Sequence, residues 1–124
     1  MQQLLTYEDM KTVVESKLQG QLHGTHLIDV RDEEEVESTG MIPGAVNVPL
    51  DQLEAALKSD PEEFQKNYAI PKPPQDDKLV VYCLSGKRAE KGEKLARECG
   101  YTKTAVYPGS WNEWSKHADE HKEG

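Results

Sequence analysis

The sequence has little of what several classes of protein require. Its two cysteines, Cys83 and Cys99, form no Cys-x-x-Cys pair and have no metal-ligand spacing, so neither a disulfide framework nor a metal site is indicated. No stretch approaches the ~20 apolar residues that a membrane-spanning helix needs. Basic residues form no stripe, and the formal net charge of −8 argues against nucleic acid or an anionic membrane as a partner. We therefore expect no metal, no nucleic-acid partner and no membrane contact.

The N-terminal residues 1–5 lack the charged and apolar regions of a signal peptide, and the acids Glu8 and Asp9 that follow argue against a mitochondrial presequence. Two unpaired cysteines are typical of a reducing compartment. We therefore expect a cytoplasmic protein. A length of 124 residues predicts one domain over residues 1–124, with its core at about residues 6–117.

Apolar runs alternate with segments of helical periodicity along the chain. Short apolar runs near residues 26–30, 45–48, 79–82 and 104–107 predict strands, and a shorter one lies at residues 4–5. Between them, apolar residues at helical spacing predict helices, the first at about residues 7–19. This alternation indicates an α/β domain with a mainly parallel sheet, whose ligands bind outside the carboxyl ends of the strands.

Residues 78–88 combine a strand, a thiol and a helix start. The apolar run ends at Cys83 and is followed by Ser85, Gly86 and two cations, after which the pattern becomes helical. The first N–H groups of a helix have no intrahelical partner and carry a partial positive charge. Such a terminus stabilises a thiolate and binds anions. The stretch therefore predicts a nucleophilic cysteine in an anion-binding loop.

The segment from Cys83 to Arg88 resembles the six-residue active-site loop of the rhodanese sulfurtransferases, especially the small single-domain ones. Residues 27–31, 40–49 and 107–114 agree with that family in order and spacing. The resemblance implies a rhodanese-like three-layer α/β domain, with a mainly parallel central sheet of about five strands flanked by helices. It also implies a cofactor-free sulfurtransferase that moves a sulfane sulfur from thiosulfate or a similar donor through a cysteine persulfide. The acceptor would be a thiol, such as glutathione or thioredoxin, or cyanide; we expect a monomer.

On this interpretation Cys83 is the nucleophile, and the backbone N–H groups of the loop receive the anionic donor. The loop residues with this role are Leu84, Ser85, Gly86, Lys87 and Arg88. The Ser85 hydroxyl adds a further donor, and Lys87 and Arg88 orient the donor's charge. Because sulfite is a stable leaving anion, the reaction demands no general acid, and no acid is evident near the loop in the sequence.

Asp29 interrupts a buried apolar run, and a buried acid needs a partner. Arg31 or a backbone N–H of a neighbouring loop is available. By resemblance, Asp29 and Arg31 support the active-site loop; alternatively, Asp29 ends its strand and caps the following turn. The four histidines have no ligand spacing, so we expect solvated surface groups at His23, His26, His117 and His121.

Two other functions remain as alternatives. One is a phosphatase or arsenate reductase of a related fold, but here Tyr82 precedes the cysteine, where tyrosine phosphatases have histidine. Only four residues separate Cys83 from Arg88, one fewer than in the phosphatase signature. The other is a persulfide carrier or a non-catalytic protein-binding module of the rhodanese type, against which the retained cysteine, glycine and cations argue.

Overall fold

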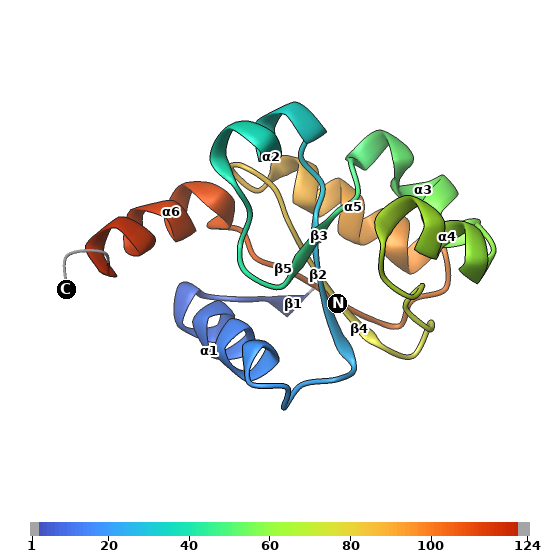
Figure 1. The fold of residues 1–124 in the computed structure, drawn as a ribbon, viewed down its shortest axis with the longest axis horizontal. Helices are drawn as coiled ribbons and strands as arrows, with labels where there is room; N and C mark the ends of the chain where they lie inside the picture. The colour runs from blue at the N-terminus through green and yellow to red at the C-terminus, as the bar shows by residue number, and fades with distance from the viewer. Residues whose placement is uncertain (1–2, 122–124) are drawn as a thin grey trace.

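The computed structural model describes residues 3–121, which form five strands and six helices around one sheet (Figure 1). The strands are β1 (Gln3–Leu4), β2 (Thr25–Asp29), β3 (Ala45–Asn47), β4 (Lys78–Tyr82) and β5 (Lys103–Val106). The helices are α1 (Tyr7–Leu18), α2 (Glu33–Thr39), α3 (Leu50–Lys58), α4 (Pro61–Tyr68), α5 (Lys87–Glu98) and α6 (Ser110–His121). The sheet order is β1-β5-β4-β2-β3 and every pair is parallel, which confirms the predicted α/β class.

Helices cover both faces of the sheet and give the fold three layers. One core contains residues from α3, α4 and α5, and the other is built with residues of α1, with Trp111 and Trp114 of α6 packed against it. Figure 1 shows α1 on the side of the sheet opposite α3, α4 and α5. Because successive strand residues point to opposite faces, β4 supplies both cores, with Val81 in the first and Val80 and Tyr82 in the second.

Local signals explain where the helices begin. Thr6 caps α1: its hydroxyl accepts the Asp9 N–H, and the Asp9 carboxylate accepts the Thr6 N–H, which confirms the helix start indicated by these residues. Asp60 precedes Pro61 at the first position of α4. In α5, Gly92 lets the helix approach the sheet closely, since a Cβ there would lie 3.1 Å from Val81 Cγ1.

The predicted surface role of the histidines is wrong at two positions. His26 Nε2 lies 2.8 Å from Asp77 Oδ2, and the His26 side chain is only 18% exposed. The ring of His117 stacks on Tyr7 at 3.7 Å between centroids. His121 lies outside the residues whose side chains are described. No helix within residues 3–121 combines the length and apolar character needed to cross a membrane.

Candidate active site

Cys83 follows directly after β4, the central strand, at the carboxyl edge of the sheet. The residue is 1% exposed, because its side chain continues the β4 alternation into the core beneath α5. Gly86 then turns the chain into α5 with φ +106°. A Cβ at this position would lie 2.8 Å from the Pro108 carbonyl oxygen, so both the backbone angle and the packing require glycine.

Two backbone N–H groups of the loop and the first turn of α5 donate to the Cys83 sulfur. The Gly86 nitrogen lies 3.0 Å from Sγ and the Ala89 nitrogen lies 3.4 Å from it. Both groups are buried, as is the sulfur itself. The loop therefore directs two buried hydrogen-bond donors at the Cys83 sulfur.

Four other N–H groups of the loop have no hydrogen-bond partner within residues 3–121. They belong to Leu84, Ser85, Lys87 and Arg88. Two of them lie in the first turn of α5, where intrahelical partners do not exist. The sequence prediction placed these same residues in an anion-binding role, and the structure brings their backbones together around one loop.

Ser110 also contacts Cys83, and the sequence analysis missed it. Its hydroxyl oxygen accepts the Cys83 N–H at 3.1 Å, lies 4.0 Å from Sγ, and donates to the Tyr107 carbonyl oxygen at 2.9 Å. The residue is fully buried and has φ +56°, in the left-handed region that non-glycine residues rarely adopt. The strained backbone and the position beside the sulfur together mark Ser110 as part of the site.

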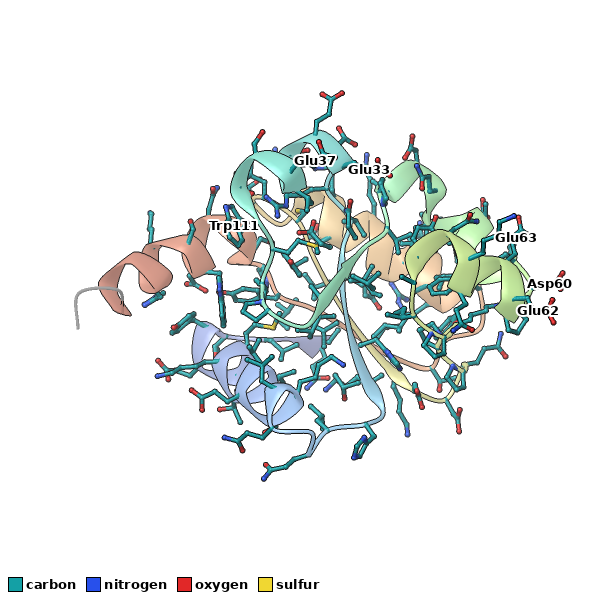
Figure 2. The ribbon with its side chains drawn as sticks, viewed as in Figure 1. Glu33, Glu37, Asp60, Glu62, Glu63 and Trp111 are labelled. Carbon is teal, nitrogen blue, oxygen red and sulfur yellow. The ribbon has the colours of Figure 1, made fainter. Side chains whose placement is uncertain are left out.

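The start of α6 fixes the catalytic loop from the other side. The Trp111 N–H donates to the Cys83 carbonyl oxygen at 2.9 Å, and the Asn112 N–H donates to the Leu84 carbonyl oxygen at 3.1 Å. Trp111 lies at the start of α6 (Figure 2). The loop is therefore held by the helix that follows β5 as well as by α5.

Arg88 is paired with an acid, which corrects the expectation that no acid lies near the loop. Its Nη1 and Nη2 donate to Glu35 Oε1 and Oε2 at 2.6 and 2.9 Å. The hydrogen bond from Arg88 is the largest cause that lowers the pKa of Glu35, and the same bond raises the pKa of Arg88.

Asp29 and Arg31 form a fully buried ion pair, with Arg31 Nη2 at 2.8 Å from Asp29 Oδ2. Arg31 also donates to the Thr39 hydroxyl and the Gly40 carbonyl oxygen, and its guanidinium lies 5.0 Å from the Trp111 ring centroid. The partner expected for Asp29 is confirmed, and Asp29 also ends β2 and accepts the Arg31 N–H, as the alternative interpretation proposed. The pair is linked to the catalytic loop through Trp111, and through Thr39 to Glu35, the partner of Arg88.

Comparison with known proteins agrees with this geometry. Residues 12–117 match the family described as the rhodanese-like domain. The chain belongs to the rhodanese-like family. This rhodanese-like chain is 40% identical over 120 residues to "Thiosulfate:glutathione sulfurtransferase" of Saccharomyces cerevisiae, covering 93% of the chain and 79% of the relative.

Two further similarities involve single-domain sulfurtransferases. The chain is 37% identical over 111 residues to "Thiosulfate sulfurtransferase RDL2, mitochondrial" of Saccharomyces cerevisiae, covering 90% of the chain and 71% of the relative. It superimposes on the human single-domain sulfurtransferase TSTD1 with a TM-score of 0.82 and 36% identity, covering 91% and 95% of the two chains. The predicted family and the predicted fold are both confirmed.

Proposed function

We propose that this chain is a sulfurtransferase that moves a sulfane sulfur from an anionic donor such as thiosulfate to a thiol. The observation that carries the proposal is the Cys83 sulfur, which accepts hydrogen bonds from two N–H groups at 3.0 and 3.4 Å. The other N–H donors of the loop have no partner among the residues that the structure describes. A loop of N–H donors at a helix N-terminus suits an anionic donor and a charged sulfur nucleophile. The sulfurtransferase names of the relatives support the same activity.

In the first half-reaction the Cys83 thiolate attacks the outer sulfur of thiosulfate. A new sulfur–sulfur bond forms at Cys83, the bond between the two sulfurs of thiosulfate breaks, and sulfite leaves with the electron pair of that bond. The loop N–H groups hold the negative charge that then resides on the terminal persulfide sulfur. No proton is needed for this step because sulfite leaves as a stable anion.

In the second half-reaction an acceptor thiolate attacks the terminal sulfur of the persulfide. The bond between the two persulfide sulfurs breaks, the acceptor leaves as a persulfide, and Cys83 returns to its thiolate form. This is covalent catalysis in two displacements, and it needs no oxidant, metal or cofactor. We propose glutathione or a thioredoxin-like protein as the acceptor, with cyanide as an alternative sulfur acceptor.

We assign five loop residues to donor binding through their backbone N–H groups: Leu84, Ser85, Gly86, Lys87 and Arg88. Lys87 is exposed beside the loop and is free to meet the outer charge of the donor. Arg88 acts from the first turn of α5 while its outer nitrogens face Glu35. Asp29 and Arg31 act as positioning residues, since Arg31 lies against the Trp111 ring and Asp29 holds Arg31 in place.

Intact-protein mass spectrometry after incubation with thiosulfate tests the proposal. We expect the wild-type protein to gain the mass of one sulfur atom and to lose it when glutathione is added. Cys83→Ser should gain nothing and remain folded, whereas the matched control Cys99→Ser should behave like wild type. A sulfur adduct that persists in Cys83→Ser would contradict the proposal.

The same experiment separates the alternatives. A persulfide that forms on Cys83 but is never passed to a thiol in repeated turnovers would indicate a carrier. A folded, reduced protein without any adduct, but with hydrolysis of p-nitrophenyl phosphate, would indicate phosphoryl chemistry of the related fold.

We further propose that residues 1–124 act as a single domain with a core at about residues 6–117, as a monomer, and in the cytoplasm. Two relatives carry "mitochondrial" in their names, so fractionation of cells that express the chain is the direct test of location. Size-exclusion chromatography with light scattering tests the monomer.

A further inference from the structure

The ion pair between Arg88 and Glu35 joins the catalytic loop to α2. Both outer nitrogens of the guanidinium are engaged, at 2.6 and 2.9 Å, in the two-pronged geometry that makes arginine–carboxylate pairs strong. The two side chains are 33% and 31% exposed, so the pair lies at the rim of the site and not within the core. Glu35 comes 53 residues before Arg88 in the chain.

Glu35 is held by groups that do not belong to the catalytic loop. Its Oε1 accepts the Asp32 N–H at 3.3 Å in the capping box of α2. The Glu35 carbonyl oxygen accepts the Thr39 hydroxyl, and that hydroxyl oxygen in turn accepts Arg31 Nη1. The Glu35 carboxylate is therefore held in place by α2, independently of the catalytic loop and of any substrate.

The pair also sets the net charge beside the nucleophile. Lys87 and Arg88 supply two positive charges at the start of α5, and Glu35 cancels one of them. Its lowered pKa, caused first by the hydrogen bond from Arg88, keeps Glu35 ionised at neutral pH. The donor and the sulfite that leaves are both anions, so a stronger positive charge would hold both more tightly.

We propose that Glu35 is a specificity-determining positioning residue that weakens the hold of Arg88 on anions, so that the donor still binds and sulfite is released quickly. The inference deepens the proposed sulfur transfer and rests on it for its kinetic consequences. Among the described residues, Glu35 bonds to Arg88 and not to the Cys83 sulfur, so it acts on the site through its charge and through the guanidinium. The effect of Glu35 on anion affinity grows with the negative charge of the anion.

The test compares Glu35→Gln with Glu37→Gln, which removes the same charge from an exposed position of α2 (Figure 2). In Glu35→Gln we expect the KM for thiosulfate and the inhibition constant for sulfite each to fall about three- to tenfold, as expected for removal of a nearby charge. Methanethiosulfonate carries one negative charge fewer than thiosulfate, so its KM should fall less. Added salt should reduce all of these effects.

Glu37→Gln should leave these constants within about twofold of wild type, because an exposed charge farther from the loop is screened. Glu35→Asp, which keeps the charge, should restore weak sulfite inhibition. Weaker sulfite binding in Glu35→Gln, or equal changes for the two donors, would show that Glu35 only supports Arg88 and would overturn the proposal.

Sulfite binding to the reduced protein, measured by calorimetry without any turnover, keeps the two proposals apart. If the wild type transfers no sulfur, the proposed function fails. The role of Glu35 is then still decided by whether Glu35→Gln binds sulfite more tightly than wild type does, which supports it, or no more tightly, which refutes it.

Discussion

Removal of the Asp29 carboxylate tests the buried ion pair that supports the site. Both side chains of the pair are 0% exposed, and the Asp29 carboxylate accepts bonds from the Arg31 N–H, Nε and Nη2. Among the described residues, Asp29→Ala leaves the buried guanidinium with Thr39, the Gly40 carbonyl oxygen and the Trp111 ring as its partners. Breaking a buried pair by deleting one partner costs about 3–5 kcal/mol.

That cost is large against the total stability of roughly 5–15 kcal/mol typical of single domains. It corresponds to a fall in the melting temperature on the order of 10–20 °C for a chain of this size. Urea unfolding followed by the fluorescence of Trp111 and Trp114 measures the loss in the free energy of unfolding directly, since both indoles pack against a core. A loss below about 1 kcal/mol with an unchanged m-value would refute the buried charge pair.

Two further variants separate the charge effect from simple loss of packing. Glu54→Ala removes one partner of an exposed pair with Lys58, in which both side chains are more than half exposed, and should cost less than about 1 kcal/mol. The double variant Asp29→Ala with Arg31→Met removes the unpaired charge, so it should recover part of the lost stability. No recovery would show that the cavity dominates the loss.

The remaining predictions concern the loop glycine, the second cysteine and the Glu35 carboxylate. Gly86→Ala places a Cβ against the Pro108 carbonyl oxygen at a positive φ, so steady-state kinetics should show a fall in kcat of about 10- to 100-fold; wild-type rates would contradict the loop geometry. Cys99→Ser should keep most of the activity, because burial raises the pKa of Cys99 and makes it a poor nucleophile; a large loss in a folded variant would reveal a role for it. The lowered pKa of Glu35 stabilises the native state above about pH 4.5, and this contribution is lost as the pH falls through the folded pKa. Between about pH 3 and pH 7, the free energy of unfolding of the wild type should therefore exceed that of Glu35→Gln only at the higher pH values. A difference that stays constant over this range would contradict the prediction.

Interactions close in sequence could be predicted from the sequence, and the structure confirms them. The Thr6–Asp9 capping box and the Asp29–Arg31 pair join residues three and two positions apart. Local patterns of apolar residues and glycine were also sufficient to place β4 and the start of α5. In each case the physical signal lies within one turn or one strand.

The partners that the sequence did not indicate are distant in the chain. Ser110 meets Cys83 across 27 residues, and Glu35 meets Arg88 across 53. Serine after glycine is typical of any turn, and Glu35 is one of several acids in a run that has the composition of a solvated helix. Only the sheet order, which brings the ends of β2, β4 and β5 to one edge, distinguishes these residues from their neighbours.

Hydrogen bonds from the first turn of α6 to the loop carbonyl oxygens determine the direction in which the N–H groups of the catalytic loop point. In a trans peptide unit the C=O and the following N–H point in opposite directions. With the Cys83 and Leu84 carbonyl oxygens turned toward α6, the N–H groups of Leu84 and Ser85 must face away from it. A flip of either peptide would break its bond to α6, so the loop presents donors before any substrate arrives. The direction of the loop N–H groups is thus set by backbone hydrogen bonds from α6.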